Sequence, residues 1–216
     1  MKAAFVAGIL LGIIVVLGAA RFYPWVDHPR SASITTVLHN GGRIEDFLIR
    51  FPVDRISSAG TAQMGLRASS FPADIELPEE FAANPVLVEH FKLRNIDGDV
   101  IGVAARHTSV TDAEATAAWA LTIPSRGTLR LRGAADPAAL DRALGAAGRV
   151  EGQAWSGDVE LAIGSVEAES GLVAGGSHEF AGLIGSYSES WSISGVSQAG
   201  ELRGTIQLHT IAEAGG

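Results

Sequence analysis

Turn-forming residues recur along this chain between segments in which apolar and polar residues alternate. Asn40-Gly41-Gly42 separates residues 34–39 from residues 43–51, and Asn-Gly supplies the positive φ angles that a tight hairpin requires. The second segment alternates with period two, which is typical of a strand, and its apolar members are Phe47, Ile49 and Phe51. A β-hairpin is therefore predicted here.

Three further hairpins are predicted by the same rule, because each pairs two alternating segments across a short polar turn. They join residues 87–94 to 99–108, residues 118–123 to 128–132, and residues 188–195 to 202–211. Additional strands are predicted at residues 150–155 and 158–167. In contrast, residues 52–85 are interrupted by prolines and predict a long irregular connection, which either covers one end of a barrel or lies on its surface.

Residues 136–147 are the one segment after the N-terminus with the marks of a helix. Asp136 can cap its first turn, Pro137 suits its first position, and Gly148 can end it. Many short strands with one helix predict a mainly β fold, an antiparallel sandwich or barrel of about nine or ten strands with one short α-helix. The alternation does not decide between a sandwich and a closed barrel.

Residues 3–20 form an uncharged apolar run. As an α-helix this run would be roughly 27 Å long, close to the ~30 Å hydrocarbon core of a bilayer. Gly18-Ala19-Ala20 would suit signal-peptide cleavage, whereas the interfacial aromatic residues that follow favour an uncleaved anchor: Phe22, Tyr23 and Trp25. We therefore predict a single transmembrane helix at residues 1–20, a linker at residues 21–33 and a β-rich domain at residues 34–216.

Small residues repeat every four positions along one face of this predicted helix: Ala4, Gly8 and Gly12. A GxxxG motif lets a second helix approach closely. The motif predicts contact with other membrane-protein subunits, or self-association through the N-terminal helix.

The charges that flank the apolar run do not fix its orientation, because Lys2 precedes it while Arg21 and Arg30 follow it. Its signal-like character favours export of the domain. Lysine occurs only at Lys2 and Lys92, and so strong a preference for arginine is typical of GC-rich bacteria. We therefore predict a single-pass protein of the bacterial inner membrane with a periplasmic C-terminal domain.

Charge and composition exclude several classes of function. The formal net charge is −8, from 16 basic and 24 acidic residues, and cysteine is absent. Nucleic-acid binding needs a basic surface that displaces counterions, so it is not expected. The lack of cysteine excludes disulfides, thiol catalysis and cysteine ligation of metals.

No motif in the chain indicates a catalytic, cofactor-binding or metal-binding site. The six histidines form no ligand-spaced pair. Asn95–Asp99 lacks the glycine and glutamate of a calcium loop, and neither a GxSxG elbow nor a phosphate-binding glycine loop occurs. A candidate surface for an acidic partner or lipid headgroups is formed by three basic residues of one predicted hairpin: Arg126, Arg130 and Arg132.

Three hypotheses about function follow from this combination. The leading one is a membrane-tethered, non-enzymatic β domain that acts as an accessory subunit or assembly factor of an envelope membrane-protein complex. The second is a carrier that binds an apolar ligand inside a β-barrel. The third is a hydrolase with an unrecognised site that uses dispersed residues such as His107 or His178.

Overall fold

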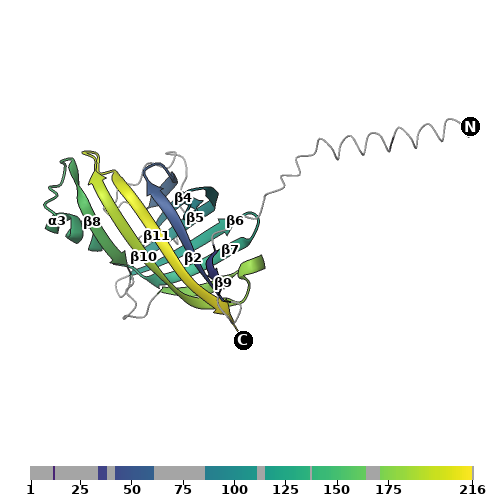
Figure 1. The fold of residues 1–216 in the computed structure, drawn as a ribbon. Coiled ribbons are helices and arrows are strands. Elements are labelled where there is room, and N and C mark those ends of the chain that lie inside the picture. The colour runs from purple at the N-terminus through teal and green to yellow at the C-terminus, as the bar shows by residue number, and fades with distance from the viewer. Residues whose placement is uncertain are drawn as a thin grey trace, which may run out of the picture.

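The computed structural model describes residue 12 and residues 34–37, 42–60, 86–110, 115–136, 138–163 and 171–215. In these residues eleven strands form one antiparallel sheet with one α-helix, and eight of the strands close into a barrel (Figure 1). In chain order the elements are β1 (Ile34–Val37), β2 (Arg43–Phe51), β3 (Arg55–Gly60), β4 (Val86–Arg94), β5 (Val100–Val110), β6 (Ala115–Ile123), β7 (Gly127–Ala134), α3 (Ala139–Ala146), β8 (Trp155–Ile163), β9 (Gly171–Gly176), the 3₁₀ turn η2 (His178–Phe180), β10 (Leu183–Val196) and β11 (Leu202–Ala214).

The ring runs β2–β11–β10–β9–β7–β6–β5–β4 and closes where Leu48 of β2 pairs with Arg94 of β4. Three strands lie outside the ring, since β1 pairs with β2, β3 with β4 and β8 with β10. Strand β10 changes neighbour along one edge: it pairs with β9 up to Tyr187 and with β8 from Glu189 onward. The pairing of β10 with its ring neighbour β9 therefore ends at Tyr187, and beyond that residue β10 pairs with β8, which lies outside the ring.

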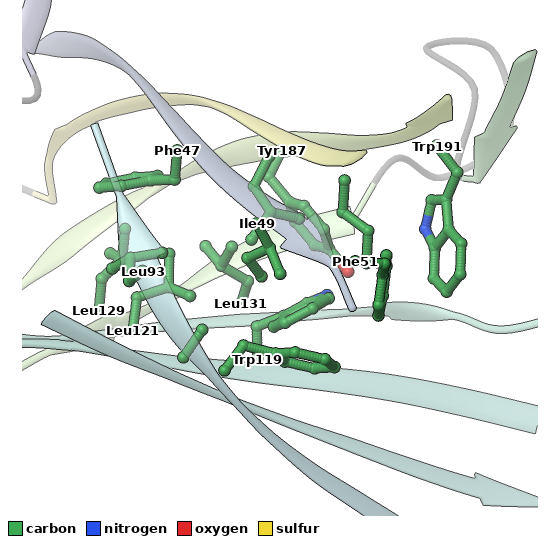
Figure 2. Close-up of a cluster of buried hydrophobic side chains, with 14 of the residues drawn as sticks. Phe47, Ile49, Phe51, Leu93, Trp119, Leu121, Leu129, Leu131, Tyr187 and Trp191 are labelled. Carbon is green, nitrogen blue, oxygen red and sulfur yellow. The ribbon is translucent and has the colours of Figure 1, made fainter. Parts of the chain in front are cut away.

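The inward face of each ring strand forms the core. Trp119 pairs with Leu131 and Leu121 with Leu129 across β6 and β7, and all four side chains are buried. Figure 2 shows leucines and Phe47 gathered in one part of the interior, with the rings of Phe51, Trp119 and Trp191 in another. The interior of an eight-stranded barrel is just wide enough for side chains to fill, which explains why these large residues are fully enclosed.

All four predicted hairpins are confirmed, as β1–β2, β4–β5, β6–β7 and β10–β11. The fold is mainly β and is a barrel, so the open choice between sandwich and barrel is resolved. Two strands were missed: β3, within the proline-rich stretch, and β9, within a glycine-rich stretch. Residues 150–154, predicted as a strand, form a turn and irregular chain instead.

The predicted helix is confirmed as α3, which lies outside the barrel beside β8 (Figure 1). It is shorter than predicted, because it begins at Ala139 and its N-cap is Ala138 instead of Asp136. Asp136 accepts a hydrogen bond from the Ala138 backbone N–H at 3.1 Å, and Gly148 follows the helix with a φ of +83°. Leu144 is the buried residue of this helix and belongs to the same core as the barrel residues.

The predicted N-terminal features lie outside the described residues, apart from Gly12. These features are the membrane segment, the linker, and the residues Ala4, Gly8, Phe22, Tyr23 and Trp25. Gly12 is helical and exposed. Among the described residues, no helix is both long enough and apolar enough to cross a membrane.

Asp54 joins the three strands at the seam of the barrel. Its side chain is fully buried, and one carboxylate oxygen lies 2.7 Å from Nη2 of Arg94. The other oxygen accepts from the Arg50 backbone N–H at 2.8 Å, and the Asp54 carbonyl accepts from the Lys92 N–H at 2.7 Å. Asp54 thus supplies contacts between β2 and β4 where regular pairing is limited to one register position.

We predict that Asp54→Ala lowers the free energy of unfolding by about 3 kcal/mol, because Arg94 would keep a largely buried charge without its carboxylate partner. Asp97→Ala, in the exposed β4–β5 turn, is the matched control and should change stability by less than about 0.5 kcal/mol. Denaturant unfolding of the full-length chain measures both values. Similar losses in the two variants would contradict a special role for Asp54.

Candidate functional site

Two groups of charged side chains lie inside the barrel. The Arg126 cluster contains Arg43, Glu45, Arg126, Glu179 and Phe180, and lies where β2, β7 and β10 begin. The Arg106 cluster lies where β5 ends and β6 begins, and it contains Arg55, Glu89, Arg106, Glu189 and the indoles of Trp119 and Trp191. The two clusters are built from similar groups, so their geometries can be compared directly.

In the Arg126 cluster, the guanidinium is tightly paired. Arg126 donates to both carboxylate oxygens of Glu45, at 2.7 and 2.8 Å, and to Glu179 at 3.1 Å. Burial alone would lower the pKa of Arg126, but hydrogen bonds to Glu45 and Glu179, and their charges, hold that pKa above its ordinary value. The guanidinium also stacks 4.8 Å from the centroid of the Phe180 ring. This arrangement has the short bidentate geometry of a strong structural ion pair.

In the Arg106 cluster, the guanidinium is held more loosely. Its nitrogens lie 3.5 Å from Glu189 and 3.7 Å from Glu89, which are longer separations than direct hydrogen bonds. The Glu189 carboxylate instead accepts from the indole N–H groups of Trp119 at 2.9 Å and Trp191 at 2.6 Å. Arg106 lies over both indole rings, 5.6 and 5.0 Å from their centroids, within the range of cation–π attraction.

Three buried polar atoms at this cluster have no hydrogen-bond partner among the described residues: Nε of Arg55, Nε of Arg106 and Oγ1 of Thr108. Arg106 and Thr108 are only 8% and 5% exposed, and they share the inward face of β5. Buried polar groups in native proteins are nearly always paired. Arg106 also lies over two indole rings, and we take this end of the barrel as a candidate ligand site.

Tyr187 lies next to this cluster. Its ring packs against the backbones of Gly171 and Gly133, where any added Cβ would collide with the ring or its hydroxyl. Burial, and then the charge of Glu189, raises the pKa of Tyr187, and the charge of Arg106 opposes this only in part. Tyr187 therefore stays neutral and can donate or accept a hydrogen bond.

The three arginines of the predicted surface do not lie together, because two are outside the barrel wall and one is inside it. Arg130 and Arg132 are exposed on the outer face of β7, whereas Arg126 is 2% exposed and belongs to the interior cluster. Sequence reasoning missed the interior charges, although a signal was present. Glu89 and Glu189 each occupy a position of inward parity between apolar residues: Glu89 between Leu87 and Phe91, and Glu189 between Tyr187 and Trp191.

The histidines considered for hydrolysis do not meet. His107 pairs with Ala118, while His178 lies beside Gly127, which pairs with Ile123. Ala118 and Ile123 are five residues apart on β6, a separation of roughly 17 Å, and both histidines are exposed. No group of three or more metal-binding side chains occurs within the described part of the chain.

Comparisons with known proteins identify no family. No family model matches the chain, and no curated protein matches it. Among solved structures, the chain is similar to a pterocarpan synthase dirigent protein, with 10% identity, a TM-score of 0.40, and coverage of 80% of this chain and 95% of that one.

We predict that Thr108→Val raises the free energy of unfolding of the ligand-free chain by about 1 kcal/mol, because it removes a buried hydroxyl without a partner. Thr210→Val is the matched control: Thr210 is equally buried, but its hydroxyl donates to the Glu45 carbonyl at 3.1 Å. The control should lose about 1 kcal/mol. Denaturant titration measures both, and a loss of stability in Thr108→Val would contradict the unpaired state of its hydroxyl.

The raised pKa of Tyr187 predicts a pH dependence of stability. An unfolded tyrosine ionises near pH 10, while folded Tyr187 keeps its proton there. The folded chain then binds more protons than the unfolded chain, so stability should fall as the pH rises above about 10. In Tyr187→Phe this part of the fall should vanish, and identical pH profiles for the two proteins would refute the assignment.

Proposed function

We propose that the protein is a membrane-tethered, non-enzymatic binding protein whose barrel holds one small molecule at the Arg106 cluster. The observation that carries the proposal is a pair of buried atoms that have no hydrogen-bond partner among the described residues, Nε of Arg106 and Oγ1 of Thr108. The Arg106 guanidinium also lies over two indole rings. A ligand site is typically built in this way, from apolar and aromatic walls with a few convergent polar groups.

Comparing Arg106 with Arg126 distinguishes the candidate ligand site from a structural ion pair. Both arginines are buried near two carboxylates, yet only Arg126 is hydrogen-bonded to them at short distance. Leaving a buried donor unpaired costs about 1–3 kcal/mol. Such a group in a folded protein calls for an explanation, and a bound ligand that pairs with it is the one we propose.

A ligand with no polar group fits this barrel poorly. The middle of the interior is occupied by buried aliphatic and aromatic side chains, among them Ile49, Leu93, Leu121, Ile206 and Leu208, each fully buried. The region near Arg106 is different, because it offers donors that only a polar group can satisfy. The bound molecule therefore needs a polar group as well as an apolar body.

The predicted tether gives the site access to the bilayer. The linker at residues 21–33 spans at most roughly 45 Å when fully extended, so an N-terminal anchor would keep the barrel beside the membrane. We retain the predicted location and propose that the protein spans the inner membrane once, with its barrel in the periplasm. A molecule that dissolves in the bilayer would then be concentrated near the barrel.

A second candidate function is that of an accessory subunit of a membrane-protein complex. It is favoured by apolar side chains on the outer wall, where Leu172, Ile184 and Ile211 are 62%, 52% and 43% exposed. Leu172 and Ile211 lie in register on either side of Ser186, and Arg132 pairs with Leu172 from β7. Exposed apolar side chains that gather in this way are typical of interaction surfaces.

One purification tests both candidates. The full-length chain is isolated from native membranes in mild detergent, and everything that co-elutes is identified by mass spectrometry. A small molecule should be found with the natural chain, at a reduced amount with Thr108→Val, and undiminished with Ser109→Ala, which changes the outer face of the same strand.

The other two outcomes of this purification count against one or both of the candidate functions. A stoichiometric protein partner without a small molecule would replace the binding function by the accessory one. A chain that elutes alone, with neither, would remove both.

A further inference from the structure

One row of paired residues crosses six neighbouring strands near the end of the barrel where β10 begins. From β7 to β1, successive members of this row are register partners: Arg132, Leu172, Ser186, Ile211, Ile44 and Thr36. Leu172 and Ile211 are exposed, as is Ile184, the next outward-facing residue along β10. Strands β10 and β11 lie side by side here (Figure 1), so the three apolar side chains share one wall.

These three residues, Leu172, Ile184 and Ile211, form an apolar crest. The wall of a closed ring of eight strands curves away on both sides of any one strand. Leu172 and Ile211 come from the two strands next to β10, and Ile184 comes from β10 itself. A flat partner that approaches β10 therefore meets the crest first.

Two exposed arginines lie beside the crest, on the outer face of β7. Arg132 pairs with Leu172, and Arg130 is the next outward-facing residue on that strand. On the side away from β7, Glu213 of β11 pairs with Ile184. The crest therefore has two cations on its β7 side and an anion on its β11 side.

The chain that precedes the described residues joins the barrel on the same row. Strand β1 begins at Ile34, two residues before the last member of the row, and three strand spacings separate β1 from β10. Three spacings amount to about 14 Å, well within the reach of the predicted linker at residues 21–33. An anchor at residues 1–20 can therefore hold the barrel with its crest against the bilayer.

The exposed apolar side chains alone would suit a protein partner as well as a lipid surface. The arginines and the position of the tether favour lipid, because apolar groups enter the headgroup boundary while long cationic side chains contact anionic headgroups. The total charge of −8 opposes such contact. Salt screens exposed charges beyond about 10 Å, however, so that Arg130 and Arg132 act locally.

We infer that the apolar crest docks on the surface of the bilayer to which the chain is tethered, with Arg130 and Arg132 against anionic phospholipid headgroups. The inference rests on the proposed membrane tether, but it does not depend on a ligand at the Arg106 cluster. It gives the barrel an orientation: β10 faces the membrane, and β5, four strands away in the ring of eight, faces the solvent.

A single fluorescent label tests this orientation, because the natural chain has no cysteine. Ser186→Cys places the label within the crest, and Val103→Cys places it on β5, at a side chain that is 41% exposed. Each full-length variant is reconstituted as one chain per nanodisc, in lipid that contains phosphatidylglycerol and a quencher attached to headgroups. The label at position 186 should be quenched, and the label at position 103 should not.

Two arginine substitutions test the headgroup contact in the Ser186→Cys background. Arg132→Gln should lower the ratio of docked to undocked chains about fivefold, as expected for one cation near an anionic lipid surface. Arg203→Gln removes the same charge from an exposed arginine at the other end of β11, so it should leave the ratio unchanged.

Equal quenching at positions 186 and 103, or equal effects of the two arginine substitutions, would overturn the inferred docking face. A disulfide between two chains carrying Ser186→Cys would assign the face to a second copy instead. Labelling at position 186 that is blocked in native membranes but not in nanodiscs would assign the face to a protein partner. Either result would overturn the inference.

An alkaline carbonate wash of vesicles made from the same lipid tests the tether separately. A chain that is quenched at position 186 but released by the wash would overturn the tether and leave the docking face in place. A chain that resists the wash without being quenched would overturn the docking face and leave the tether in place.

Discussion

Closure of the barrel between β2 and β4 is the constraint on which the rest of the structure depends. Seven of the eight junctions in the ring are made by strand pairs joined at three or more register positions, but this junction has only Leu48 opposite Arg94. Asp54 completes it through its carboxylate and its carbonyl. With the seam closed, every ring strand has two ring neighbours over at least part of its length, and the inward side chains are buried.

Because the interior is enclosed, a charged side chain there is stable only where an opposite charge or a hydrogen-bond partner lies beside it. The Arg126 cluster shows the arrangement that a purely structural arginine reaches, with short bidentate bonds and a stacked ring. In the Arg106 cluster, the two tryptophans take up the carboxylate of Glu189, and Arg106 is left at longer distances. The same residue types therefore produce one tightly paired cluster and one in which Nε of Arg55 and Nε of Arg106 have no hydrogen-bond partner among the described residues.

The sequence predicts much of the fold because most ring strands have one buried and one exposed face. Phe47, Ile49 and Phe51 indicate such a face by their period of two, and short polar turns that contain glycine mark the hairpins. Strand β9 was missed because its glycines carry no alternating pattern. One of them, Gly171, leaves the space in which the ring of Tyr187 lies. Strand β3 was missed because prolines precede and follow it in the sequence, and because its partner strand β4 begins only at Val86.

The candidate site could not be predicted in the same way. A charged residue at an inward position, such as Glu189, is visible in the sequence, but its partner depends on which strands face each other across the barrel. Arg106 of β5 and Glu189 of β10 meet only because the ring closes. The hairpins alone therefore predict the strands of the barrel wall. Which side chains meet inside the barrel depends on how the ring closes.

The two glycines beneath Tyr187 have a consequence for how the site can diversify. Because Gly133 and Gly171 provide the space in which the tyrosine ring lies, a methyl group at either position would force that ring to a new place. Neither glycine has a side chain that could touch a ligand. A substitution at either position would therefore change the space at the candidate site, while the arginine, the carboxylates and the indoles stay the same.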